Sequence, residues 1–417
     1  MNEKRNRTIS LFSLFFFIII TKLSLSVLLP IQATADSIIY YTVASNITNN
    51  KCVSRSEVNG KVCAPDWGGN QLFGYPLFLG VIGADSKSSL INAVLIQNLL
   101  LSLSIIYFLV IVSDRFRLNK RYTTLLGVTL TLSPLQLGWA NSILTEGLAL
   151  SILFLFLAET TIAIFDKKIK VIRWGMLLLI AFFVRYEFAV LCLAVPLLCF
   201  YSYNSKVALL KTTSIGLIVL LPTTMWIARS VSLGLPVPPK LAMVKPHLEY
   251  TEGFDRWFRS WSVKASDNPS VFWKVLRAQY SQVSIEDYAF DSEEQKKQVL
   301  KLFEVLIDYE GESIPVHIDK EFYIIGTENI ENRPFAFYVL NPLTRLKNMF
   351  LDFSYDHRLP IRIAAEEKNT FNMRIKSAST AQDFISIVTD YPKKIVFSTL
   401  IAVYKLALYL FFAFLIF

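Results

Sequence analysis

Long apolar runs, separated by short charged turns, dominate the pattern of hydrophobic and polar positions in this sequence. Most of these runs approach the roughly 20 apolar residues that a helix needs to cross a bilayer. The expected membrane spans are residues 9–30, 89–113, 122–138, 146–165, 174–184, 188–203, 207–227 and 395–417. The pattern therefore predicts an α-helical polytopic membrane protein with about eight transmembrane helices.

The remaining sequence forms two polar parts. A first loop, residues 31–88, separates the first two spans, and a segment of mixed polarity, residues 230–391, precedes the last span. Because the second part lacks a long apolar run, we expect it to fold outside the bilayer. Residues 1–229 then form one transmembrane module.

One helix is predicted inside the longer polar part. Apolar residues recur at helical spacing between Glu293 and Tyr309, and Gly311 is expected to stop the helix. The run Asp291-Ser292-Glu293-Glu294 has a carboxylate spacing that sugar-nucleotide enzymes use for metals. Its place at the start of a helix makes capping the better interpretation.

Basic residues set the expected orientation. The turns at residues 115–121 and 166–173 are rich in Lys and Arg, which favours the cytoplasmic face. The N-terminus would then be cytoplasmic in a multi-pass plasma (inner) membrane protein, with residues 230–391 extracytoplasmic. These turns carry much of the net charge of +9, and no nucleic-acid-binding module is present, so no nucleic acid partner is expected.

Two stretches allow alternatives. The first run, with its basic start and the following Ala33-Thr34-Ala35, also fits a cleavable secretory signal, although its length favours a retained span. The stretch from Trp174 to Phe200 is either one long helix or two short ones that meet at Arg185-Tyr186-Glu187. One helix would place two ionisable groups near mid-bilayer and reverse the orientation of everything after it. We favour two helices.

The four cysteines fall into two pairs. Cys192 and Cys199 lie in an apolar run and are expected to be inert packing residues. Cys52 and Cys63 lie in the first loop, where they can form a disulfide if that loop faces an oxidising space.

Charged residues gather at one expected membrane surface. With the topology above, Asp36, Glu146, Arg185, Glu187 and Arg229 all lie at the outer ends of apolar spans. Helix ends often carry charges without a function, but ionisable residues near membrane depth are functional candidates. A carboxylate there can take a proton from an attacking hydroxyl, and an arginine can hold a lipid phosphate. The arrangement suits a reaction on a lipid-phosphate substrate.

A series of short motifs in the sequence resembles those of a known family. They are Asp36-Ser37 with Tyr40-Tyr41 and Ala44, Gly74-Tyr75-Pro76-Leu77-Phe78-Leu79, Ser133-Pro134, Leu144-Thr145-Glu146, Arg185-Tyr186-Glu187, and Trp226 with Arg229. In this order they resemble motifs of the GT-C superfamily of polytopic membrane glycosyltransferases, in particular those similar to protein mannosyltransferases and lipid A aminoarabinose transferases. The resemblance covers residues 11–238.

The resemblance implies a fold and a reaction. It implies a GT-C-like fold and an inverting transfer of a sugar from a polyprenyl-phosphate donor to a lipid, glycan or protein acceptor on the outer face, with Asp36 as the general base. Binding of the lipid phosphate and sugar falls to Tyr40, Tyr75, Glu146, Arg185, Glu187 and Arg229. The family often has two adjacent acids, whereas Ser37 follows Asp36 here, and Asp66 is the candidate for a second acid. Ser230 also replaces an expected Asn, and relatives usually continue beyond eight spans. A divalent metal would fit the chemistry, but no clear motif supports one.

Two other functions use the same charges. A transporter or flippase for a lipid-linked glycan would line its path with them, although the internal symmetry common in transporters is not visible in the sequence. A non-catalytic assembly subunit is the third alternative.

Overall fold

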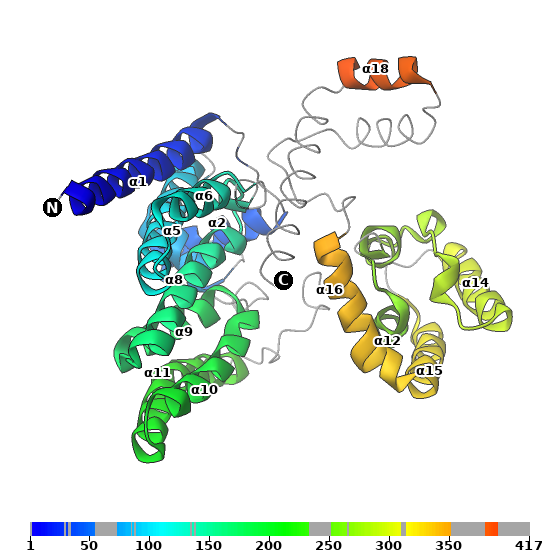
Figure 1. Cartoon of the computed structure of the whole chain (residues 1–417). Coiled ribbons are helices and arrows are strands. Elements are labelled where there is room, and N and C mark those ends of the chain that lie inside the picture. Colours follow the sequence, from blue (N-terminus) through cyan, green and yellow to red (C-terminus); the bar gives the residue numbers. More distant parts are fainter. Residues whose placement is uncertain are drawn as a thin grey trace. The chain divides into compact units, whose positions relative to one another are not determined.

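The computed structural model describes residues 2–28, 31, 35–54, 73–84, 86, 89–133, 136, 139–232, 252–264, 267–309, 314–351 and 380–390. The chain divides into two compact units (Figure 1). The first comprises Met1–Val237 and His357–Phe417, and the second comprises Pro238–Asp356. In the described residues the regular structure is helical, without a β-strand. The expected last span, residues 395–417, lies outside them.

Three helices of the first unit are long and apolar enough to cross a membrane, counting only the described residues: α5 (Leu90–Arg115), α8 (Thr145–Asp166) and α11 (Ser205–Ser232). Large apolar side chains of α11 are more than half exposed, namely Leu209, Leu210, Leu217, Leu220, Leu221 and Met225. An exposed surface of this kind is unfavourable in water and natural in lipid. The composition and the helices together indicate an α-helical membrane protein.

The other helices of this unit are shorter or less apolar. They are α1 (Asn2–Leu28), α2 (Ala35–Asn50), α4 (Gly74–Val81), α6 (Lys120–Thr131), α9 (Val171–Val184), the 3₁₀ helix η2 (Tyr186–Leu193), α10 (Ala194–Ser202) and α18 (Ala381–Asp390). Helix α6 is shorter than the expected span of residues 122–138. Pro134 follows it in the sequence, and helices usually end before the residue that precedes a proline.

The first loop contains helices that the sequence pattern did not indicate. Residues 31–88 were expected to be a polar loop, but α2 and α4 form within them and pack against each other. Helix α2 is rich in Ile, Val and Thr, which have modest helix propensity. Its contact with α4 is close at Gly80, where a Cβ atom would lie 3.1 Å from Thr48 Cγ2. Tertiary packing, rather than local propensity, therefore stabilises these helices.

The stretch from Trp174 to Phe200 is two helical segments rather than one helix. Helix α9 ends at Val184, Arg185 is extended with φ −150° and ψ 121°, and η2 begins at Tyr186. At the far end of this hairpin, the Ile169 amide donates to the Tyr203 hydroxyl at 2.7 Å, so its two ends meet. Arg185 thus lies at the apex of a hairpin.

A buried carboxylate connects three helices of the first unit. The Glu159 side chain of α8 accepts hydrogen bonds from Tyr107 of α5 at 2.7 Å and from Arg173 of α9 at 2.8 Å. Burying a charge is costly unless it is paired, and both partners satisfy this one. The three helices therefore have a fixed relation to one another.

The second unit has an aromatic core. Its helices are α12 (Glu252–Trp261), η4 (Asn268–Phe272), α13 (Trp273–Val275), η5 (Tyr280–Gln282), η6 (Asp287–Ala289), α14 (Glu293–Ile307), α15 (Val316–Asn332), η7 (Ala336–Leu340) and α16 (Asn341–Leu351). Phe254, Trp257, Phe258, Phe303 and Phe322 are buried together between α12, α14 and α15. This apolar core explains how a segment without a long apolar run folds.

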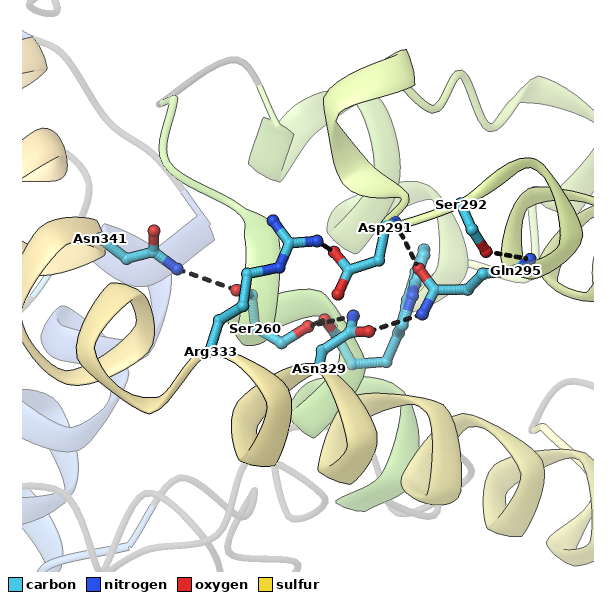
Figure 2. A network of polar contacts seen from close by, with 8 residues as sticks. Ser260, Asp291, Ser292, Gln295, Asn329, Arg333 and Asn341 are labelled. Carbon is cyan, nitrogen blue, oxygen red and sulfur yellow. Dashed lines mark hydrogen bonds and ion pairs between the residues drawn. The ribbon is translucent and has the colours of Figure 1, made fainter.

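Polar contacts fix the ends of these helices. The Ser292 hydroxyl accepts from the Gln295 amide at 3.1 Å and caps α14, which confirms the capping interpretation of residues 291–294. Figure 2 shows how this cap continues through Gln295 to Asn329, whose amide donates to Ser260 Oγ at 3.0 Å. A network of side chains therefore joins α14, α15 and α12.

The crossing of α12 and α15 depends on glycine. A Cβ atom on Gly326 would lie 2.6 Å from the Trp257 backbone nitrogen, a clash that no side-chain movement relieves. We expect Gly326→Ala to destabilise the second unit by about 1–3 kcal/mol, as overpacked cores do. Hydrogen–deuterium exchange of the full chain should then speed up in residues 252–261 and 316–332.

Gly216→Ala is the matched control, since Gly216 is also helical and a Cβ atom there meets nothing within 4 Å. Equal exchange in both variants would contradict the close crossing.

Candidate functional site

An ion-pair cluster occupies the apex of the α9–η2 hairpin. The Arg185 guanidinium lies 2.9 Å from Glu146 Oε1 through Nη1 and 3.1 Å from Glu187 Oε1 through Nη2. Glu146 and Glu187 stand in the first turns of α8 and η2, where the helix dipole favours a negative charge. The three side chains are about 30–50% exposed. The cluster is therefore open to a ligand.

The ion pair between Arg185 and Glu187 favours the charged form of both side chains. Desolvation lowers the pKa of Arg185, but hydrogen bonding with Glu187 and the charge of Glu146 outweigh it, so the pKa is raised. Desolvation also opposes ionisation of Glu187, yet the hydrogen bond from Arg185 leaves the pKa of Glu187 below its ordinary value of 4.5.

Two tyrosines adjoin this cluster. The rings of Tyr40 on α2 and Tyr75 on α4 meet edge to face, with centroids 5.1 Å apart. Burial, with the charges of Asp36 and Glu146, raises the pKa of Tyr40 to about 12. Burial also raises the pKa of Tyr75 well above its ordinary value. Both tyrosines are neutral hydrogen-bonding groups at physiological pH.

Tyr75 is held by a buried amide. Its hydroxyl lies 2.5 Å from Gln97 Oε1, and Gln97 Nε2 donates to the carbonyls of Ala140 at 3.3 Å and Ser142 at 3.2 Å. Gln97 is fully buried in the first half of α5. A satisfied polar network of this kind fixes the position of the Tyr75 ring.

Asp36 lies one helical turn before Tyr40. Its side chain is exposed, and it makes no ion pair with a described residue. The next residue, Ser37, is fully buried and donates to the Ile143 carbonyl at 2.8 Å. This bond holds the start of α2 against the chain that leads into Glu146. Asp36 is thus a solvent-accessible carboxylate whose negative charge acts on Tyr40.

Arg229 belongs to an aromatic group beside the hairpin. Its guanidinium lies over the Trp226 ring, 4.7 Å from the centroid. The Phe73 ring contacts both Trp226 and Phe183, with centroid distances of 4.6 and 4.8 Å. Gly74 allows this approach, since a Cβ atom there would lie 2.5 Å from the Phe183 carbonyl oxygen. The Gly-Tyr-Pro motif thus joins α4 to the end of α9.

The structure brings most of the predicted site residues together. Tyr40, Tyr75, Glu146, Arg185 and Glu187 form one group, and the negative charge of Asp36 acts on it. Thr145 and Gln97 also belong to this group. Thr145 lies 3.4 Å from Arg185 Nη1 and hydrogen-bonds Tyr40. Gln97 had a signal in the sequence, because a polar amide interrupts an apolar run.

The predictions for the second acid, the cysteines and a metal have separate outcomes. Asp66 and Cys63 lie outside the described residues. Cys52 is disulfide-bonded, while Cys192 and Cys199 are free. Among the described residues, no three His, Cys, Asp or Glu side chains are placed to hold a metal ion.

Comparisons with known proteins give the chain no family. No protein-family model matches the sequence, and no curated protein matches it significantly. The GT-C assignment therefore remains a prediction from the motifs and from the site they describe.

Acid should weaken the contribution of the Arg185–Glu187 pair to folding stability. In the folded protein the pKa of Glu187 is below its ordinary value of 4.5. The ion pair with Arg185 therefore stabilises the fold fully above pH 4.5, and this stabilisation is lost as the pH falls through the folded-state pKa. Glu187→Gln should therefore lose less stability than the wild type between neutral pH and about pH 3.5. The difference should be below about 1 kcal/mol, because the pair is partly exposed.

Melting temperatures of the detergent-solubilised protein measure this difference. Glu321→Gln, at an exposed position of the second unit, is the control and should follow the wild type. An acid response of Glu187→Gln equal to that of the wild type would contradict the role of the pair.

Proposed function

We propose that this chain is a GT-C-type membrane glycosyltransferase, which moves a sugar from a polyprenyl-phosphate donor to an acceptor at the outer face of the plasma membrane. One observation carries the proposal. The exposed Asp36 carboxylate lies one helical turn from Tyr40, whose neighbours are Tyr75, Glu146 and Arg185. Four of the six short sequence motifs, distant along the chain, contribute to this single group.

The charges suggest separate roles. Arg185 with Glu146 and Glu187 carries one positive and two negative charges, so this cluster alone does not favour a phosphate. Its carboxylates suit hydrogen bonds from sugar hydroxyls. We assign the lipid phosphate to Arg229, whose guanidinium stacks on Trp226 at the end of α11. Tyr40 and Tyr75 form an amphipathic wall for the sugar.

The proposed reaction is a single displacement. Asp36 takes the proton of the acceptor hydroxyl, whose oxygen attacks the anomeric carbon of the donor. The bond from that carbon to the phosphate oxygen breaks, and its electron pair leaves with the polyprenyl phosphate. Attack opposite to the leaving group inverts the anomeric configuration.

The proposed orientation follows the basic turns. Residues 166–173 lie at the end of the hairpin opposite to Arg185, and basic turns favour the cytoplasm. Arg185 and Asp36 would then face outward, the N-terminus would be cytoplasmic, and the second unit would be extracytoplasmic. About eight spans complete this topology, with the hairpin segments supplying the fifth and sixth.

We expect Asp36→Asn to reduce sugar transfer by about 100-fold or more, since general-base catalysis contributes 10²–10⁴-fold. Membranes that contain the variant would be supplied with a labelled polyprenyl-phosphate sugar, and transfer to endogenous acceptors would be measured. The variant should insert and accumulate normally.

Asp308→Asn, at an exposed position of the second unit, should retain full transfer. Normal transfer by Asp36→Asn would overturn the mechanism. Translocation of the labelled lipid by the wild type without transfer would favour a transporter.

Topology provides an independent test. A reporter fused near Leu300 should be active outside the cytoplasm, because two helical segments rather than one precede α11. A fusion after Lys168, in the basic turn that directly precedes the hairpin, should report the cytoplasm. A cytoplasmic signal near Leu300 would refute the proposed orientation and with it the outer-face reaction.

A further inference from the structure

The last helix of the second unit has an unusual orientation. Residues 334–351, here called the 334–351 helix, run through the wide π turn of η7 into α16. The π turn directly precedes Asn341-Pro342. Since proline lacks an amide hydrogen and clashes with the carbonyl of the preceding turn, the wider turn accommodates it. The helix therefore continues past the proline.

The polar side of this helix points into the unit. Asn341 donates to the Ser260 carbonyl at 2.9 Å, as Figure 2 shows. Arg345 donates to the carbonyls of Ser262 at 2.8 Å and Arg259 at 2.9 Å. These carbonyls lie at the C-terminal end of α12, where helix carbonyls lack partners within the helix. The contacts fix the rotation of the 334–351 helix about its own axis.

The apolar side consequently points outward. Phe335 is 65% exposed, Tyr338 69% and Leu343 55%. A helix on the surface of a water-soluble domain places its apolar side toward the core. Here the side chains of Asn341 and Arg345 point toward α12, while Phe335, Tyr338 and Leu343 are exposed. An exposed apolar surface of this kind marks an interaction site.

Charge and chain connectivity identify the partner. Residues 333–351 contain three basic residues and no acidic residue. Arg333 pairs with Asp291 and Arg345 with the α12 carbonyls, whereas Lys347 is exposed. Basic residues beside tyrosine, phenylalanine and leucine are typical of helices that lie in the surface of a bilayer with anionic lipids. Only residues 233–251 separate the apolar helix α11 from α12, so the unit is tethered close to a membrane.

We propose that the 334–351 helix lies in the surface of the phospholipid bilayer, with Phe335, Tyr338 and Leu343 among the headgroups and upper acyl chains. The helix thereby holds the second unit against the membrane. The residues of this surface are not those of the Asp36–Arg185 group, and the proposal holds whether or not the chain transfers sugars.

Photocrosslinking in nanodiscs tests the proposal on the full chain. Benzoylphenylalanine would replace Tyr338, and the nanodiscs would contain an alkyne-labelled mixture of phosphatidylcholine and phosphatidylglycerol. The matched control replaces Tyr309, another exposed tyrosine of the same unit, which follows α14. Both positions are exposed, so neither replacement should disturb the core.

For a helix in the bilayer surface, we expect position 338 to give at least about fivefold more lipid adduct than position 309. Similar lipid yields at both positions, whether high or absent, would overturn the proposal. Adducts at position 338 that join only protein, either within the chain or between two copies, would overturn it as well and would assign the surface to a protein partner.

Discussion

The pairing of Arg185 with two carboxylates sets the place where the chain of the first unit turns back. An unpaired arginine between apolar helices is costly, and a continuous helix through Arg185 and Glu187 would carry both charges into the bilayer. The extended backbone at Arg185 avoids this cost and turns the chain back. Glu146 must then reach the apex from α8, which fixes where that helix begins.

Packing around the apex follows from this constraint. Residues of α2, α4, α5, α8 and α9 contribute to one apolar core, which includes Ala44, Leu79, Val94, Leu148 and Val184. Tyr75 belongs to this core, and Tyr40 packs against it and contacts Tyr75 edge to face. At the other end of the bundle, Glu159 pairs with Arg173 and sets the relation of α5, α8 and α9. Charge pairs therefore fix both ends of an apolar bundle.

The sequence predicts the parts of this fold that depend on composition. Apolar runs indicated α5, α8 and α11, and the charges at Arg185 and Glu187 indicated the break between two segments. The motifs also selected most of the site, because residues at the ends of neighbouring spans meet at one surface. Ser292 as a cap followed from a local pattern, which needs no tertiary information.

Features that depend on tertiary contacts were missed. Helices α2 and α4 have little local signal and form because they pack on each other and on the bundle. Thr145 and Gln97 join the site through hydrogen bonds to residues far away in sequence. The reversed orientation of the 334–351 helix depends on the carbonyls of α12, which the sequence of the helix itself does not reveal.

The Gln97 bridge has a consequence for how this protein can vary. Gln97 holds Tyr75 through backbone carbonyls at Ala140 and Ser142, so the identity of those two side chains does not enter the contact. The side chain at position 147 does affect this contact, because a Cβ atom on Gly147 would lie 2.8 Å from Gln97 Nε2. Tyr75, Gln97 and Gly147 are therefore coupled through direct contact, so the effects of substitutions at these three positions should not be additive.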